Sequence, residues 1–487
     1  MIINHEQTPL FTTLKKHALN NPTPFHIPGH KCGQGMDPEF RDFLGPNALS
    51  IDLIGIEPLD DLHQPQGAIL AAEQLAAAAF GADHCFFSVQ GTTGAILTMI
   101  LATCRPGEKI ILPRNAHKSI LSALILSGAE PVFLTPELDQ DRGIMHGISS
   151  AALKQALNQH PDTKAVLVIN PTYYGSCSDL SSIVETVHTY KIPVLVDEAH
   201  GVLNYFSPLM PCSAMAAGAD LAATSVHKLG GSLTQSSVLN LQGKLVNKDQ
   251  VRNILSMITT TSTSYLLLAS LDTARRYLAL QGEFLIARML KLARKTRTQI
   301  NQIEALKCHG PEIINGSSIF DLDESKLLIN LEQTSILGNA AEKWLRNQAN
   351  IEVELSDLHN LLCFLTLGDN SETTAKLIQG LKSLAKQFSV STSLRASHVS
   401  HTLPALPKLA LNPRQAFYAS KRSCPLKQAS SQISAEFVTI YPPGIPVLIP
   451  GEVLTEENIS YIEECQRAGL LVYGTQDPTV QRMHVVK

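Results

Sequence analysis

The sequence lacks long hydrophobic runs, paired cysteines and an excess of basic residues. It has no eighteen uninterrupted apolar residues, which argues against a transmembrane helix. Nine cysteines occur without a CxxC pair, a usage typical of reduced thiols in a cytoplasm. The net charge of −4, from 39 basic and 43 acidic residues, favours neither nucleic acid nor a membrane surface as partner. The opening MIINHEQTPLFTTLKKH also lacks the basic-then-apolar order of a signal peptide.

The length of 487 residues predicts two or more domains, and 44% hydrophobic with 17% charged residues indicates a soluble globular chain. Residues 1–66 are rich in proline, glycine and histidine and are expected to form an N-terminal arm. We expect a large domain over 67–300, a smaller α+β domain over 301–400 and a last domain over 401–487. Ser391–Pro407 is polar and is expected to be a linker.

From about residue 67, short apolar runs alternate with helical segments. This alternation predicts an α/β fold with a mostly parallel sheet covered on both faces, with ligands at the carboxyl ends of the strands. The expected strands are Cys85–Val89, Lys109–Leu112, Pro131–Leu134, Ala165–Ile169, Val194–Val196, Leu221–Thr224 and Val238–Leu241. The expected helices are Ala68–Phe80, Ala95–Thr103, Ser119–Ser127, Ala151–Asn158, Leu180–Tyr190 and Thr273–Ile303.

The strongest local signal is Ser225-Val226-His227-Lys228-Leu229-Gly230-Gly231, directly after an expected strand. Small residues beside Lys228 permit the close approach of a ligand. Taken alone, the segment favours a surface lysine in a glycine-rich turn over a functional one.

A second signal is Asp197-Glu198-Ala199-His200, which ends the strand one step earlier in the chain. A pyridoxal-phosphate (PLP) site needs a lysine for the aldehyde and a carboxylate that keeps the pyridine nitrogen protonated. The alternative for Asp197 is a helix N-cap. The same four letters mark an ATP-dependent helicase motif, but the required GxxxxGK[ST] loop is absent from the sequence.

Two further strand-end loops could complete such a site. Gln90-Gly91-Thr92-Thr93-Gly94 offers backbone N–H groups and hydroxyls to a phosphate, although ordinary turns look similar. Arg114–Ser119 contains His117, whose ring could stack on a pyridine; a solvated loop is the alternative. The turn Asn170–Gly175 could wall the same crevice.

Candidate metal ligands are few. His26 and His30 are four residues apart, but Pro28-Gly29 between them forbids a regular helix. Asp60, Asp61 and His63 match no ligand spacing, so no metal site is expected.

Together these motifs resemble the short form of the Orn/Lys/Arg decarboxylase family, nearly from end to end. The motifs that carry the resemblance, in order, are Phe25–Lys31, Pro58–Leu62, Gly91–Thr93, Arg114–Ser119, Pro171–Gly175, Asp197–Gly201, Ser225–Lys228, Ala435-Glu436, Tyr441–Pro446 and Pro450–Glu452.

The resemblance implies an aspartate-aminotransferase-like fold (PLP fold type I) with a seven-stranded sheet and smaller C-terminal domains. It implies that Lys228 forms a Schiff base with PLP, that Asp197 faces the pyridine nitrogen, and that His117 stacks on the ring. His200 would sit beside the ring. The phosphate would be held by the segment Gly91-Thr92-Thr93 together with Ser225 and His227. The family also forms at least homodimers with shared sites, to which His30 and Lys31 would contribute.

The implied activity is α-decarboxylation of a basic amino acid for polyamine metabolism. Arginine and lysine are favoured and ornithine stays open, because Ile54-Gly55 and Ser431-Gln432 depart from the family pattern toward the substrate entrance. The group that reprotonates Cα, assembly beyond a dimer and the residues that read the substrate side chain are not fixed by the sequence. An aminotransferase, a β-eliminase or an inactive decarboxylase-like regulator are the alternatives.

Overall fold

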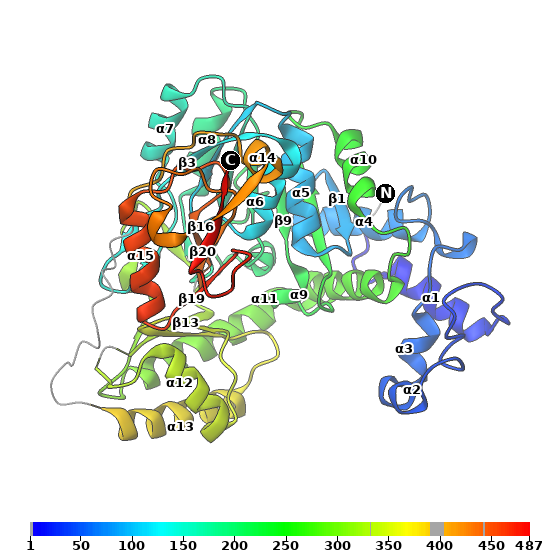
Figure 1. Ribbon diagram of the computed structural model, residues 1–487. Coiled ribbons are helices and arrows are strands. Elements are labelled where there is room, and N and C mark those ends of the chain that lie inside the picture. The colour runs from blue at the N-terminus through cyan, green and yellow to red at the C-terminus, as the bar shows by residue number, and fades with distance from the viewer. Residues whose placement is uncertain (1–2, 332, 390–403, 442–443) are drawn as a thin grey trace. The chain divides into compact units, whose positions relative to one another are not determined.

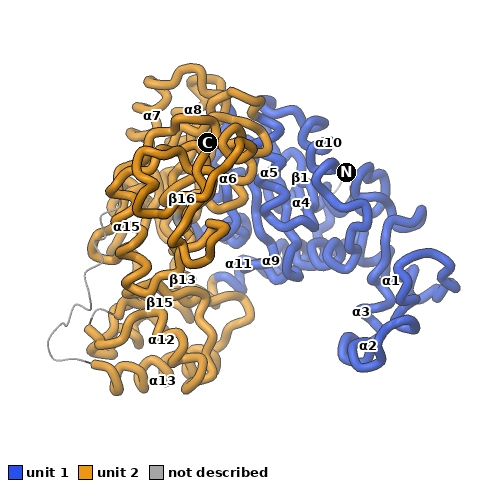
Figure 2. Tube along the Cα trace, in the orientation of Figure 1, with its two compact units in different colours: residues 1–103, 193–286 blue, residues 104–192, 287–487 orange. Residues whose placement is uncertain are grey.

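The computed structural model describes residues 3–331, 333–389, 404–441 and 444–487. The chain forms two compact units, residues 1–103 with 193–286 and residues 104–192 with 287–487 (Figure 2). Most of the expected linker Ser391–Pro407 lies outside the described residues, as do Pro442 and Pro443 of the proline-rich turn. The division into an N-terminal arm and three domains stays a prediction.

The largest sheet has seven strands in the order β1-β10-β9-β8-β6-β2-β3. Of these strands, β1, β9 and β3 are labelled in Figure 1. Strand β10 is antiparallel to both neighbours, whereas β8 with β9, β2 with β6 and β2 with β3 are parallel. The predicted seven-stranded, mostly parallel sheet is therefore confirmed. Its strands are β1 (His84–Ser88), β10 (Ser237–Leu241), β9 (Leu221–Thr224), β8 (Val194–Asp197), β6 (Ala165–Ile169), β2 (Lys109–Pro113) and β3 (Glu130–Leu134).

The first unit contains helices α4 (Ala68–Phe80), α5 (Gly91–Thr103) and α10 (Lys248–Ile258), with the first part of α11 (Tyr265–Ile300). Helix α5 begins four residues before the expected Ala95. Its first turn is built from residues typical of loops, and it packs tightly there: a Cβ at Gly94 would lie 2.7 Å from the Cβ of Gln90. The missing side chain at Gly94 therefore lets the helix start at the strand end.

The N-terminal segment forms three helices, α1 (Pro9–Asn20), α2 (Pro38–Leu44) and α3 (Pro46–Ile51). None of the three is among the helices expected from the sequence. Each helix begins at a proline, whose fixed φ suits a first helical position.

A buried ion pair on α11 anchors α1. Asp272 accepts hydrogen bonds from the N–H groups of Leu10 and Phe11, at the positive end of α1. Arg275 pairs with Asp272 at 2.8 Å and donates to the carbonyl oxygens of His5 and Gln7. The start of the chain is thus tied to the long helix through hydrogen bonds to Asp272 and Arg275.

The second unit carries helices α6 (Lys118–Ser127), α7 (Ser150–Gln159) and α8 (Leu180–His188) beside β6, β2 and β3. It also holds an antiparallel sheet in the order β11-β13-β15-β14, accompanied by α12 and α13. The bounds are β11 (Lys307–His309), β13 (Lys326–Asn330), β15 (Asn360–Phe364), β14 (Leu355–Ser356), α12 (Gly338–Trp344), η4 (Leu345–Ala349) and α13 (Ser371–Phe388).

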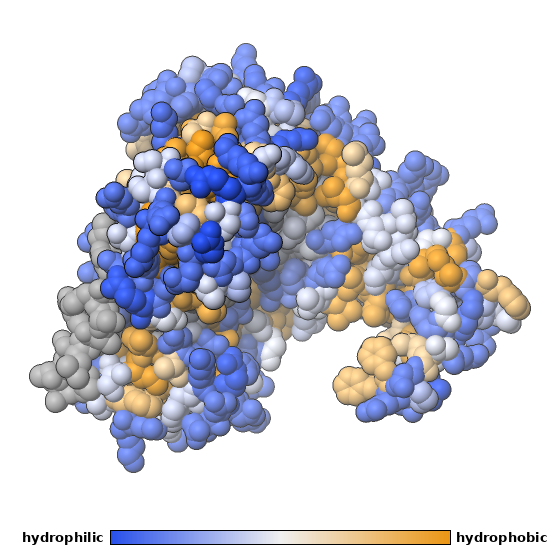
Figure 3. Space-filling model, viewed as in Figure 1, coloured by the Kyte–Doolittle hydropathy of each residue, from blue (hydrophilic) through white to orange (hydrophobic). Residues whose placement is uncertain are grey.

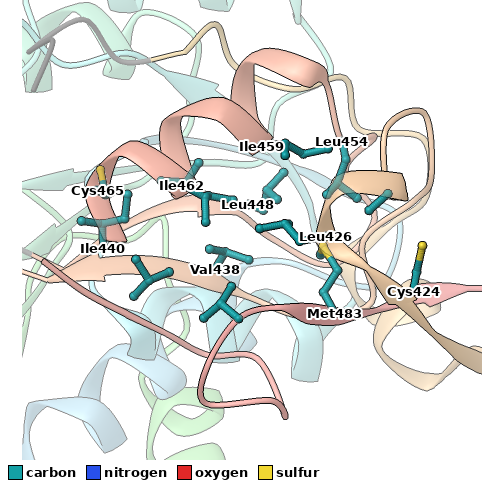
Figure 4. Close-up of a cluster of buried hydrophobic side chains, with 14 of the residues drawn as sticks. Cys424, Leu426, Val438, Ile440, Leu448, Leu454, Ile459, Ile462, Cys465 and Met483 are labelled. Carbon is teal, nitrogen blue, oxygen red and sulfur yellow. The ribbon is translucent and has the colours of Figure 1, made fainter. Parts of the chain in front are cut away.

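The end of the chain has its own apolar core (Figure 4). Ile459 and Ile462 of α15 (Glu456–Arg467) face Val438, Leu448 and the neighbouring strands. The other elements of this part are α14 (Pro413–Tyr418), β16 (Lys421–Pro425), η5 (Leu426–Gln428), β17 (Val438–Tyr441), β18 (Ile445–Leu448), β19 (Leu471–Tyr473) and β20 (Arg482–Val486).

Shorter elements connect these parts. They are η1 (Glu57–Leu59), β4 (Leu138–Asp139), β5 (Ile144–Met145), β7 (Ser176–Cys177), η2 (Val202–Tyr205), α9 (Val226–Leu229), η3 (Pro311–Ile313) and β12 (Asp321–Leu322). Among the helices of the described residues, none has the combination of length and apolarity needed to span a bilayer.

Candidate active site

The site is built on the carboxyl ends of β8 and β9, two adjacent parallel strands. Asp197 is the last residue of β8 and pairs in register with Ala223 of β9. The N–H of Glu198 donates to the carbonyl of Ala223 at 3.0 Å, which carries the pairing one residue further. Because both strands are buried along their length, the Asp197 side chain is only 4% exposed. A carboxylate is thus held at a fixed strand end.

Lys228 lies on the short helix α9, four residues after β9. Val226 and Leu229 are buried and hold this turn against the sheet, while Lys228 itself is exposed. The Nζ atom of Lys228 lies 2.8 Å from Nε2 of His200, which follows Asp197 by three residues. The lysine motif and the Asp197–His200 motif therefore meet at the same edge of the sheet.

Asp197 does not cap a helix. Its Oδ1 accepts a hydrogen bond from the N–H of Ala199 at 3.2 Å, whereas the next helical turn, η2, has Gly201 at its N-cap position. The N-cap alternative is wrong for this residue, and its carboxylate stays at the strand end beside the lysine turn.

Glu198, next to Asp197, points to the interior. It is fully buried and accepts hydrogen bonds from the Tyr205 hydroxyl, the Ala214 N–H and the Thr224 hydroxyl. Burial, with a smaller contribution from the nearby Asp197 charge, raises the pKa of Glu198 to about 8, and these hydrogen bonds act in the opposite direction. At neutral pH Glu198 is mostly protonated, so the end of β8 avoids two adjacent negative charges.

Hydroxyl groups from three segments converge at the start of α5. Thr92 Oγ1 contacts Ser225 Oγ and lies 2.7 Å from Ser237 Oγ, the first residue of β10. Gly91 begins α5 with φ of +67° and donates its N–H to the carbonyl of Gln235 at 2.9 Å. The first N–H groups of a helix lack intrahelical partners, so this turn with its hydroxyls can bind an anion.

Two more predicted residues flank this cluster. Thr93 is exposed on the first turn of α5. The His227 ring is half-buried, and its Nδ1 lies 2.8 Å from the carbonyl oxygen of Ser236. A carbonyl only accepts, so Nδ1 carries the proton. Burial lowers the pKa of His227, and the neighbouring Lys228 charge acts in the same direction.

His117 belongs to the second compact unit, as does the turn Asn170–Gly175. It is the N-cap residue of α6: its Nδ1 accepts a hydrogen bond from the N–H of Ser119 at 3.2 Å. The ring is exposed, so it can contact a ligand. Its stacking on a cofactor ring stays a prediction.

Sequence reasoning missed Ser237 and the inward role of Glu198. Ser237 follows Thr234-Gln235-Ser236, a polar run that signals a loop but not which strand end it reaches. One feature of the sequence could have indicated the burial of Glu198: it lies directly between an apolar strand and the small residue Ala199. Over the described residues, no group of three His, Cys, Asp or Glu side chains is arranged to hold a metal ion.

Comparisons with known proteins agree with this geometry. The major-domain model of the Orn/Lys/Arg decarboxylases matches residues 8–373, and their C-terminal-domain model matches 396–474. An arginine decarboxylase of Bacillus subtilis is 57% identical over 485 residues, covering 100% of this chain and 99% of that protein.

Two solved structures share the fold. The constitutive lysine decarboxylase of Escherichia coli superposes with a TM-score of 0.84 at 21% identity, over 99% of this chain and 82% of that one. The serine palmitoyltransferase of Sphingomonas wittichii gives 0.55 at 18% identity, over 73% and 85%. The architecture is that of the PLP enzymes of fold type I. With both family models matched along its length, the chain belongs to the Orn/Lys/Arg decarboxylase family, whose members are carbon–carbon lyases acting on basic amino acids.

Proposed function

We propose that this enzyme removes the α-carboxyl group of arginine, giving agmatine and CO₂, with PLP carried on Lys228. The observation that supports this most is the 2.8 Å contact between Lys228 Nζ and His200 Nε2, at the strand end that carries Asp197. Arginine is chosen over lysine and ornithine because a relative 57% identical over the whole chain is named an arginine decarboxylase.

The chemistry of the donor set fits PLP. Lys228 offers an exposed primary amine for the aldehyde, and Asp197 offers a buried carboxylate for the pyridine nitrogen. The Thr92 and Ser225 hydroxyls lie beside the first turn of α5, where a phosphate would be bound by N–H groups and by the helix dipole. Gly91, Thr93 and His227 border the same position.

When bound, PLP supplies a sink for the electron pair that stays on Cα as CO₂ leaves. The residues of this chain control protons around it. Asp197 holds a proton on the pyridine nitrogen, and a neutral Glu198 behind it avoids a competing charge. We propose that the His200–Lys228 pair returns a proton to Cα, and the short contact between the two side chains supports this role. His117 orients the ring by stacking on one face.

We further propose that the enzyme works as a homodimer or larger homo-oligomer. Exposed apolar side chains gather on the N-terminal segment around α2 and α3 (Figure 3): Phe25 is 95% and Phe43 88% exposed. Surfaces of this kind mark contacts between proteins. A second copy is the expected occupant, with His30 and Lys31 of this segment next to its site.

A cytoplasmic location fits the cysteines. Exposed Cys32 and buried Cys85 and Cys465 carry thiols rather than disulfides, as a reducing compartment requires. The product agmatine would then enter polyamine synthesis.

The test is to incubate the PLP-loaded enzyme with arginine, lysine or ornithine and to quantify CO₂, the amine product and any 2-oxo acid. We expect CO₂ and agmatine in equal amounts from arginine, with much slower turnover of the two shorter substrates. If the diamine forms from lysine or ornithine faster than agmatine forms from arginine, the assignment of arginine as the substrate would be wrong. A 2-oxo acid formed without CO₂ would show transamination, and the proposed reaction would be wrong.

A further inference from the structure

A buried ion pair joins the end of β2 to the C-terminal part of the second unit. Arg114 Nη1 lies 2.6 Å from Glu452 Oε1, and Nη2 lies 2.8 Å from Oε2. The same guanidinium donates to the carbonyl oxygens of Pro446 at 3.0 Å and Val447 at 3.1 Å. The two charged side chains are 4% and 2% exposed. Four donated hydrogen bonds therefore fix Arg114 against one short segment.

Glu452 is held as firmly as its partner. Its Oε2 also accepts the N–H of Ile449 at 2.9 Å. The preceding Gly451 has φ of +97°, and a Cβ there would lie 2.2 Å from the carbonyl oxygen of Leu411, so only glycine fits. On either side, Leu448 and Leu454 point into the C-terminal core (Figure 4). The position of the carboxylate is thus set by a folded core.

Stability alone does not explain this pair. Removing two charged groups from water costs free energy that their mutual attraction can fail to recover. Replacing a buried ion pair by well-packed apolar residues of similar volume is therefore often neutral or stabilising. What the pair provides is geometry: a guanidinium and a carboxylate joined by two parallel bonds have a fixed mutual orientation. The guanidinium also lies 4.7 Å from the centre of the Phe133 ring, which restricts it from another side.

Arg114 and His117 lie on one short stretch of backbone. The two residues are separated by Asn115 and the fully buried Ala116, a span of roughly 10 Å at most. The N–H of Arg114 is itself bonded to the carbonyl of Leu134 at 2.8 Å. From the other side, Ser119 holds the His117 ring through Nδ1. The exposed ring therefore stands on a segment fixed at both ends.

We propose that Arg114 and Glu452 are positioning residues for His117, and that the C-terminal Pro450-Gly451-Glu452 turn acts on cofactor binding through them. This inference rests on the proposed function, since it assigns the His117 ring to the PLP ring. It gives the C-terminal segment a role in the site although neither Glu452 nor Gly451 would touch the cofactor.

The experiment is a double-mutant cycle on PLP affinity, measured by titrating the apoenzyme and following the visible absorbance and circular dichroism of the bound cofactor. Glu452→Gln keeps the shape and one acceptor but removes the charge. We expect its Kd for PLP to rise about tenfold, with a changed dichroic signal. In the His117→Ala background, Glu452→Gln is expected to cause no further rise in the Kd for PLP, because the ring that the pair positions is absent. Arg114→Lys keeps the positive charge but cannot form two parallel hydrogen bonds to the carboxylate. It should raise the Kd for PLP to a similar extent as Glu452→Gln.

The matched control is Glu436→Gln. Glu436 is another buried acid of the C-terminal part, bonded to the N–H groups of Gln476 and His484 and to the His484 ring. We expect this variant to lower the thermal midpoint without changing the Kd for PLP.

An unchanged Kd in Glu452→Gln, or a tenfold loss that persists in the His117→Ala background, would overturn the positioning role. If Glu452→Gln does not fold, Arg114→Lys in the same cycle decides by the same criteria. Failure of the unmodified protein to bind PLP would instead overturn the proposed function.

Discussion

At the scale of single residues, the two neighbouring acids at the end of β8 differ in the direction of their side chains and in their surroundings. Asp197 remains at the strand end, whereas Glu198 turns inward and is surrounded by Tyr205, Thr224 and the Ala214 N–H. Thr224 leads into the lysine turn, so Glu198 bridges the ends of β8 and β9. A neutral acid can do this without placing a second negative charge beside Asp197.

This state of Glu198 predicts how stability depends on pH. The unfolded chain releases the Glu198 proton near its ordinary pKa of 4.5, whereas the folded protein keeps it to about 8. Between these values the folded state binds more protons, so this residue makes the free energy of unfolding fall as pH rises, by up to about 1.4 kcal/mol for each pH unit. Above about 8 the contribution is constant. Glu198→Gln should therefore flatten the decline between pH 4.5 and 8, as measured by urea unfolding across this range.

A second buried acid provides the matched control. Burial raises the pKa of Asp357 to about 6 from its ordinary 3.8, so Asp357→Asn should flatten the profile only between about pH 4 and 6. Parallel profiles for Glu198→Gln and the unmodified protein above pH 6 would contradict a protonated Glu198.

At the scale of secondary-structure elements, buried strands could be predicted from the sequence with good accuracy. The bounds of β6 and β9 agree with the expected runs, because short apolar segments between turns have few alternatives. The starts of α4 and α8 also agree with the expected Ala68 and Leu180, but the starts of α5 and α11 do not agree with the expected ones. Helix α11 begins at Tyr265, eight residues before the expected Thr273, because its first turns are apolar and buried rather than amphipathic.

Some residues of the candidate site could be predicted from the local sequence, and others could not. Lys228 and Asp197 follow buried strands, so their placement at one edge of the sheet could be expected. Ser237 could not, because an all-parallel sheet would put the start of β10 at the opposite edge. Strand β10 is antiparallel, and Val238 pairs with Thr224, which brings Ser237 beside the end of β9. Strand direction is decided by packing and not by local sequence.

At the scale of the whole molecule, the N-terminal segment exposes apolar side chains that a second protein surface could cover. Helix α2 has seven residues and none is buried, although isolated helices of this length are marginal in water. Phe40 and Phe43 on α2 are both exposed. A second copy packed on these residues would supply the missing apolar contacts.

The prediction is that Phe25→Ser combined with Phe43→Ser shifts the enzyme from dimer or larger oligomer to monomer at micromolar concentration, as measured by analytical ultracentrifugation. If the site is shared between subunits as proposed, activity should fall together with the oligomer. Leu471→Ser, at a residue 68% exposed on β19, is the control and should leave the assembly unchanged. A monomeric unmodified enzyme with full activity would contradict the shared-site arrangement.

The lysine that carries the cofactor can be identified chemically. The PLP-loaded enzyme is reduced with borohydride, digested, and mapped by mass spectrometry for a pyridoxyl group. We predict one modified residue for each chain, Lys228, and no modification after Lys228→Ala. A pyridoxyl group on any other lysine, or its persistence in Lys228→Ala, would contradict the account.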